Sequence, residues 1–246
     1  MKKKFSEIPK IVWFQLFLLA LGYAFYSANR LSFGVGLKAV AASISLTAVQ
    51  LGTISTIFTL GQALIDIPAG YLADRFGRKR LLVMSMVGLG CMTALVTTSS
   101  NFISAAFWRL MFGVTEGCWN IVMYSVAGSI FPAARAMLNG LMMTFYSIGA
   151  YVGPAYYGWS LETTGEWSIG LQHMGAVTVV FGLLLIVGFK SKYTDILSFF
   201  SGPLMGFLTS TLGHAAALDI IVVAFEAVLV VVAFFMKETQ HRAESK

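Results

Sequence analysis

The apolar stretch at residues 102–130 carries the side chains best suited to chemistry. Arg109 and Glu116 stand in it among mostly apolar neighbours. At about 100° per residue of helix, a sector of roughly 80° also holds Gly113, Asn120 and Tyr124. At bilayer depth an ionisable group costs at least ~2.5–3.5 kcal/mol, so this face should point inward or toward water. Because Arg109 and Glu116 lie about two helical turns apart, we expect each to have a partner on another helix.

Two earlier stretches add polar residues that could line the same cavity. One stripe in residues 11–36 holds Tyr23, Ser27 and Arg30, and one in residues 47–72 holds Ser55, Thr59, Gln62 and Asp66. Arg30 and Arg109 together would give a cavity two positive charges, which suit a carboxylate or phosphate. If Arg30 instead pairs with Asp66 or Glu116, the cavity is nearly neutral and a sugar fits as well. A third alternative is that Arg30 extends toward the outer interface.

These stretches have the composition of membrane-spanning helices. Of the 246 residues, 57% are apolar and 11% are charged. The apolar residues come in blocks of about 20, enough to cross ~30 Å of hydrocarbon. Long apolar runs without a period of two favour helices over a barrel. The sequence therefore predicts an all-α integral membrane protein with about eight spans: 11–36, 47–72, 80–99, 102–130, 137–160, 169–189, 196–213 and 215–236.

The basic residues predict the orientation of these spans. If eight spans alternate across the membrane, 14 of the 17 Lys and Arg residues fall on one side, which the positive-inside rule makes cytoplasmic. Both termini are then cytoplasmic, and we expect a multi-pass protein of the plasma (inner) membrane. Because the basic clusters lie between apolar blocks, they indicate topology, and no nucleic-acid partner is expected.

The sequence lacks the signatures of several other functions. His173, His214 and His241 have no spacing that suits a metal site, so no metal is expected. Cys91 and Cys118 lie within apolar runs and are interpreted as packing residues. A Walker-type glycine loop is also missing, so ATP-driven pumping is not expected. We therefore predict that the chain is not an enzyme.

The most specific segment joins the second and third spans. It reads Gly70-Tyr71-Leu72-Ala73-Asp74-Arg75-Phe76-Gly77-Arg78-Lys79-Arg80. Gly70 is expected to let a neighbouring backbone come close, and Gly77 to permit the sharp turn of a short helical hairpin. The basic residues should face anionic headgroups. Asp74 is expected to pair with Arg75 or Arg78, or to meet a helix N-terminus.

This segment resembles the signature loop between helices two and three of the major facilitator superfamily. Residues 131–136 resemble the family's weaker loop between helices four and five, and Gly149, Gly153, Pro154 and Gly158 resemble its helix-five motif. The run from Arg109 to Gly117 is similar to helix four of its organic-anion and sugar-acid symporters. The resemblance implies proton-coupled transport of a small organic anion or sugar acid, powered by a proton gradient and without another cofactor.

Candidate roles follow for individual residues. The resemblance implies that Asp74 latches the two transporter halves in one state, within a loop that includes Gly70, Arg75, Gly77, Arg78 and Lys79. It also implies that Glu116 takes part in proton coupling, for which Asp66 is a second candidate. The candidate substrate-binding residues are Tyr23, Arg30, Arg109 and Asn120.

The chain departs from the family's twelve-helix plan. Residues 1–192 correspond to the first six-helix half, whereas residues 193–246 resemble only the last two helices with a cytoplasmic tail. Helices seven to ten are therefore expected to be absent. Alternating access needs one bundle to rock against another, so we expect this short chain to be inactive without a homodimer or another membrane partner. The alternative hypothesis is a non-transporting membrane remnant or helical partner subunit.

Overall fold

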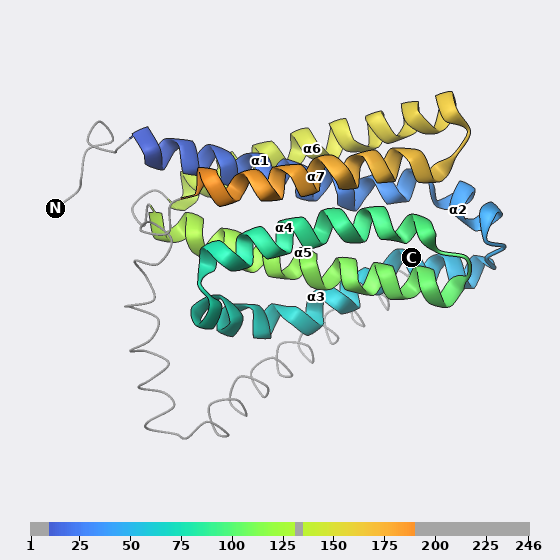
Figure 1. The fold of residues 1–246 in the computed structure, drawn as a ribbon, viewed down its shortest axis with the longest axis horizontal. Helices are drawn as coiled ribbons and strands as arrows, with labels where there is room; N and C mark the ends of the chain where they lie inside the picture. The colour runs from blue at the N-terminus through green and yellow to red at the C-terminus, as the bar shows by residue number, and fades with distance from the viewer. Residues whose placement is uncertain (1–9, 131–134, 190–246) are drawn as a thin grey trace, which may run out of the picture. The chain divides into compact units, whose positions relative to one another are not determined.

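A computed structural model describes residues 10–130 and 135–189 as a bundle of six long helices (Figure 1). They are α1 (Lys10–Val35), α3 (Ala48–Phe76), α4 (Arg78–Leu95), α5 (Phe102–Ile130), α6 (Arg135–Thr164) and α7 (Trp167–Gly188). Two short elements lie between them, α2 (Leu37–Ser43) and the 3-10 helix η2 (Val96–Thr98). This part of the chain contains no strand, which confirms the all-α class.

The first six predicted spans agree with the six long helices to within about four residues at each end. The short helix α2 was not predicted. The seventh and eighth spans, and the segment 193–246 as a whole, lie outside the described residues. The total number of spans and the side on which the termini lie therefore stay predictions.

Four of the described helical segments are long and apolar enough to cross a membrane: Ile11–Val35, Ala48–Phe76, Arg78–Thr98 and Trp167–Gly188. Helices α5 and α6, with 29 and 30 residues, pack among these segments (Figure 1). The outer face of α7 exposes a row of apolar side chains that includes Val180, Leu184 and Val187. Such a surface suits contact with lipid rather than with water.

Local sequence signals explain where the helices begin and end. Helix α3 begins with a capping box, in which the Thr47 hydroxyl accepts a hydrogen bond from the Gln50 amide N–H and the Gln50 side chain accepts one from the Thr47 N–H. It ends at Gly77, whose φ of 87° lies in the left-handed region. Helix α4 begins at the next residue. The sharp turn predicted at Gly77 is therefore confirmed.

Replacing Gly77 with alanine is expected to lower the free energy of unfolding by about 1–2 kcal/mol, because a side chain is strained at this φ. The matched control is Gly70→Ala, which lies within α3, where a Cβ would meet no atom within 4 Å. Alanine should be neutral or stabilising there by up to about 1 kcal/mol. Thermal unfolding of both variants in detergent checks the difference. Equal midpoints would contradict the assigned turn.

The long helices pack mainly in three pairs: α1 with α6, α3 with α5, and α4 with α7. Glycines allow the paired backbones to come close, as is common between membrane helices. A Cβ at Gly113 would overlap the carbonyl oxygen of Phe58 in α3, and a Cβ at Gly149 would overlap that of Ala24 in α1. Helix α1 also contacts α5, and a hydrogen bond from Gln62 of α3 to Tyr26 of α1 brings α1, α3 and α5 together around one region of the bundle.

The helix-five motif contributes to the contact between α1 and α6. Besides Gly149, Gly153 lies against Ala28 of α1, and Pro154 follows inside α6 without ending the helix. A Cβ at Gly158 would only touch Val35 at 3.9 Å. The motif therefore builds the packing seam mainly through its first two glycines.

Candidate functional site

The polar face predicted on α5 lies in the interior of the bundle. The side chain of Glu116 is fully buried, and Arg109 is 4% exposed. Arg109 contacts Phe33, which belongs to one apolar cluster, and Phe112, which belongs to the other. The two ionisable residues of α5 are thus enclosed within the apolar core.

Glu116 has a cationic partner on α1. The Arg30 Nη1 lies 3.4 Å from the Glu116 Oε1, and the same nitrogen donates a hydrogen bond to the Tyr26 hydroxyl at 2.9 Å. The Gln62 amide reaches this hydroxyl from α3 at 3.5 Å. The Arg30 side chain is 26% exposed, so one side of the guanidinium stays accessible. This pairing was one of the alternatives that the sequence left open for Arg30.

Arg109 is surrounded by aromatic rings. Its guanidinium carbon lies 4.2 Å from the centroid of Phe33, 4.9 Å from that of Phe58 and 4.8 Å from that of Phe112. Aromatic faces attract a cation through the ring quadrupole. Among the described residues Arg109 forms no ion pair, and its Nε has no hydrogen-bond partner. Its positive charge is therefore not balanced by a contacting carboxylate in this part of the chain.

Tyrosines form a second part of the site. The Tyr124 hydroxyl of α5 donates to the Tyr23 hydroxyl of α1 at 3.2 Å. Tyr23 also packs against the rings of Tyr26 and Tyr146, with centroids 5.1 Å away in each case. The Asn120 Oδ1, one turn before Tyr124, has no hydrogen-bond partner in the described part of the chain. These groups add neutral hydrogen-bonding capacity beside the Arg30–Glu116 pair.

Some residues of the two predicted stripes do not join this arrangement. The Ser27 hydroxyl donates to the carbonyls of Ala24 and Tyr146, so it serves packing between α1 and α6. Asp66 is exposed and has no ion pair among the described residues. Its Oδ1 lies beside α5, where a Cβ at Gly117 would come within 3.0 Å.

The acidic residue of the α3–α4 loop pairs as predicted. The Arg78 Nη2 lies 3.6 Å from the Asp74 Oδ1, and Arg78 is buried, whereas Asp74 is largely exposed. Lys79 donates a hydrogen bond from its Nζ to the carbonyl oxygen of Ile186, in the last turn of α7, at 2.7 Å. A cation at a helix C-terminus is electrostatically favourable. The loop therefore connects α3, α4 and α7 at one end of the bundle.

Two other residues of this loop have different surroundings. The guanidinium of Arg75 lies over the ring of Phe76, at 5.7 Å from the centroid. Gly70 differs from expectation, because no neighbouring backbone approaches it within the described residues, where a Cβ would meet nothing within 4 Å.

Several residues of the site were not selected from the sequence. The most important is Tyr26, whose hydroxyl bonds to Arg30. Its position four residues before Arg30 on a helix was an available signal, since such residues share a face. Phe33, Phe58 and Phe112 surround Arg109, but no sequence pattern separates them from the other 17 phenylalanines.

The charges of the site sum to one excess positive charge. Arg30 and Glu116 balance each other, and Arg109 adds a further cation. Low polarity around the pair strengthens the attraction between its members and also the pull on any anion that enters.

Comparisons with known proteins agree with this architecture. Residues 19–197 match the family described as the Major Facilitator Superfamily. The chain is similar to the hexuronate transporter of Bacillus subtilis, with 23% identity over 72% of this chain and 42% of that protein. It is also similar to the cis,cis-muconate transport protein of Acinetobacter baylyi, with 24% identity over 73% of this chain and 44% of that protein. The chain thus spans less than half the length of these relatives.

Solved structures show the same fold. The inward-facing, occupied form of a bacterial homologue of the human lysosomal transporter Spinster superposes with a TM-score of 0.66 and 21% identity, over 75% of this chain and 45% of that chain. The inward-open xylose transporter XylE from E. coli gives a TM-score of 0.65 at 15% identity, over 88% of this chain and 56% of that chain. The family comprises transporters, in agreement with the prediction that the chain is not an enzyme. The chain is a multi-pass membrane protein and belongs to the major facilitator superfamily.

Proposed function

We propose that this bundle forms the solute-binding part of a transporter that moves a small organic anion, such as a sugar acid, together with a proton. The observation that carries this proposal is the Arg30–Glu116 pair at 3.4 Å, with the unbalanced cation of Arg109 nearby. A carboxylate solute can bind an arginine in bidentate fashion, but Glu116 competes for Arg30.

Protonation of Glu116 removes this competition. A neutral carboxyl group holds a guanidinium less strongly than a carboxylate does, so the donors of Arg30 become available to the solute. The Glu116 Oε2, which has no hydrogen-bond partner in the described residues, is the oxygen positioned to take the proton. One anion and one proton therefore bind together, and the site keeps the same net charge.

The other groups set the preference for the solute. Arg109 supplies a positive potential that favours an anion over a neutral sugar. Asn120 and the Tyr23–Tyr124 pair offer hydrogen bonds to solute hydroxyls. Asp66 is retained as a second proton-coupling candidate. Its carboxylate lies beside α5 at Gly117, the residue that follows Glu116.

Names of relatives support an anionic solute. The hexuronate transporter, the cis,cis-muconate transport protein and the probable sulfoacetate transporter of Cupriavidus necator are all named for organic anions. Each is about 23–24% identical to this chain over about 180 residues. We propose the same class of solute here, with the plasma membrane as the location.

Alternating access requires a second bundle that faces this one. We propose that the exposed side of α3, which includes Leu60, Leu64 and Ile67, faces that bundle. Of the two partners expected from the sequence, a homodimer or another membrane protein, the homodimer would supply it from a second copy. Cysteine at Leu64 should then form a crosslink between two copies in native membranes, whereas cysteine at Val187, on the outer face of α7, should not.

The test of the function is uptake of organic acids and neutral sugars into proteoliposomes that contain the full chain. Uptake of an acid that needs a pH gradient, and little uptake of a neutral sugar, is expected. Arg30→Gln should abolish this uptake, because it removes the cation that binds the carboxylate. No uptake by folded protein, with or without a gradient, would favour the alternative of a non-transporting partner subunit.

Replacing Tyr26 with phenylalanine should raise the KM for the anion by at least about tenfold, because a hydrogen bond to a charged group contributes about 1.5–3 kcal/mol. Tyr157→Phe is the matched control, since its hydroxyl donates to the Trp167 carbonyl in the other apolar cluster. That variant should keep the wild-type KM. Initial uptake rates over a range of anion concentrations check this, and equal KM values for both variants would contradict a role for Tyr26.

A further inference from the structure

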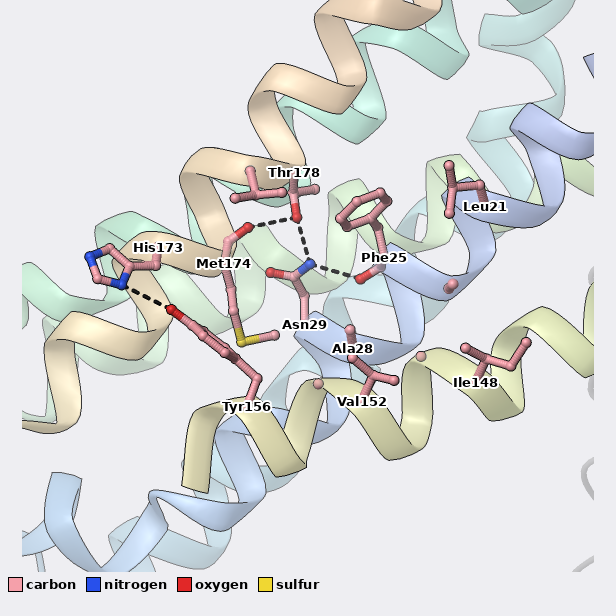
Figure 2. A pocket seen from close by; sticks show the side chains of 14 residues that line it. Leu21, Phe25, Ala28, Asn29, Ile148, Val152, Tyr156, His173, Met174 and Thr178 are labelled. Carbon is pink, nitrogen blue, oxygen red and sulfur yellow. Dashed lines mark hydrogen bonds between the residues drawn. The ribbon is translucent and has the colours of Figure 1, made fainter. Parts of the chain in front are cut away.

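A groove of about 370 Å³ lies between α1, α6 and α7 (Figure 2). Its walls are almost entirely apolar and include Phe25 of α1, Val152 of α6 and Met174 of α7. The volume is in the range of sites that bind small molecules. Arg30, Arg109 and Glu116 are not among the residues that line it, so this groove is separate from the candidate solute site.

Small residues create the groove. Gly149 and Gly153 of α6 pack directly on Ala24 and Ala28 of α1, and this seam forms part of the groove lining. A Cβ at either glycine would collide with α1, so these glycines let α6 lie directly on α1. The close contact of one helix pair thus leaves a gap beside the third helix.

The groove opens on the lipid-facing surface of the bundle. Ile148, Val152 and Val177 line it and are themselves about half exposed. Along α7 the exposed apolar surface continues through Val180 and Leu184. A molecule in the groove would therefore be reached from the hydrocarbon of the bilayer.

One polar pair lies on this otherwise apolar surface. The Tyr156 hydroxyl and the His173 Nδ1 are 3.0 Å apart, and Figure 2 shows them at one side of the groove, bridging α6 and α7. His173 is six residues from the start of α7, or about 9 Å along the helix axis. The 22 residues of α7 span about 33 Å, close to the ~30 Å of the hydrocarbon core, so the pair lies about a quarter of the way along α7 from its N-terminal end.

The donors at the base of the groove are already bonded within the protein, whereas the Asn29 Oδ1 has no hydrogen-bond partner among the described residues. The Asn29 Nδ2 donates to the Phe25 carbonyl at 2.7 Å and to the Thr178 hydroxyl at 2.8 Å, and that hydroxyl donates to the Met174 carbonyl. Figure 2 shows these bonds side by side. The base therefore has no donor left for a polar solute and offers one free acceptor, while the apolar lining around it suits a hydrocarbon chain.

We propose that the groove binds one acyl chain of a glycerophospholipid, with the ester region of the lipid at the Tyr156–His173 pair. When the His173 Nδ1 accepts from Tyr156, the Nε2–H is a donor, and lipid esters and phosphates offer only acceptors there. The chain then runs from this pair toward the middle of the membrane, along Val152 and Ile148. This assignment explains both an apolar groove open to lipid and a polar pair at its border.

The experiment is native mass spectrometry of the full chain, released from detergent that contains a palmitoyl-oleoyl phosphatidylglycerol. Wild-type protein is expected to retain one lipid. Val152→Trp, which places a large side chain in the groove, should weaken retention by about tenfold or more, as expected if about two methylenes lose their contacts. Val180→Trp is the matched control, because Val180 is equally exposed on α7 but does not line the groove. It should retain the lipid as the wild type does.

Two further measurements distinguish recognition of the acyl chain from recognition of the lipid headgroup. Phosphatidylcholine with the same chains should be retained equally well, because the proposal assigns recognition to the chain and ester region. The Tyr156→Phe, His173→Ala double variant should release either lipid more readily than the wild type does. Val177→Trp provides a second groove-filling change if Val152→Trp does not fold. Equal retention by wild type and a folded groove-filling variant, or equal loss in Val180→Trp, would overturn the proposal.

Discussion

Glu116→Gln is expected to abolish the stimulation of anion uptake by a pH gradient while anion exchange continues. Glutamine has nearly the shape of glutamic acid but neither ionises nor takes up a proton. The solute therefore no longer competes with a carboxylate for Arg30. The anion should then bind without a proton. Proteoliposomes with the anion on both sides measure exchange, and an imposed gradient measures coupling. Uptake that still responds to the gradient would contradict the role of Glu116.

Glu162→Gln is the control for this variant. It makes the same chemical change at an exposed residue near the end of α6. Gradient-driven uptake should keep its wild-type rate. A loss in this variant too would mean that the assay responds to net charge and not to the Arg30–Glu116 pair.

Gly113→Ala is expected to destabilise the bundle by about 2–3 kcal/mol, although alanine favours helices. The added Cβ would overlap the carbonyl oxygen of Phe58, so α3 and α5 must move apart. This contact also sets the distance between Arg109 on α5 and the ring of Phe58 on α3. Thermal unfolding in detergent, followed by circular dichroism, measures the change.

Gly52→Ala separates the contact from helix propensity. Gly52 lies in α3, and a Cβ there would meet no atom within 4 Å. Alanine should stabilise that helix by up to about 1 kcal/mol. If both variants shift the unfolding midpoint in the same direction and by the same amount, the α3–α5 packing described here is wrong.

The sequence predicted the helices and the polar face of α5 because their signals are periodic. Apolar blocks of membrane length locate the spans, and the spacing of Arg109, Glu116 and Asn120 places them on one face. It also predicted that Arg109 and Glu116 would need partners on other helices. For Glu116 this is confirmed by Arg30, whereas Arg109 has aromatic rings around it and, within residues 10–130 and 135–189, no ionic partner.

Other features depend on how the helices pair, which a periodic pattern does not specify. Arg30 could have paired with Asp66 or Glu116, and only the packing of α1 against α5 decides for Glu116. The aromatic surroundings of Arg109 combine residues from three helices. The groove beside Tyr156 and His173 arises from three helices whose contacts leave a gap, and no spacing along one helix indicates it.

The most direct test of the account is the proton balance of anion binding. The detergent-solubilised full chain is mixed with a saturating organic acid anion in weakly buffered solution, and the proton change is followed with a pH indicator at pH values from about 5 to about 9. We expect uptake of up to one proton per bound anion in the wild type and none in Glu116→Gln, which should still bind the anion. Anion binding by the wild type without proton uptake at any pH would contradict the exchange of Glu116 for the solute at Arg30.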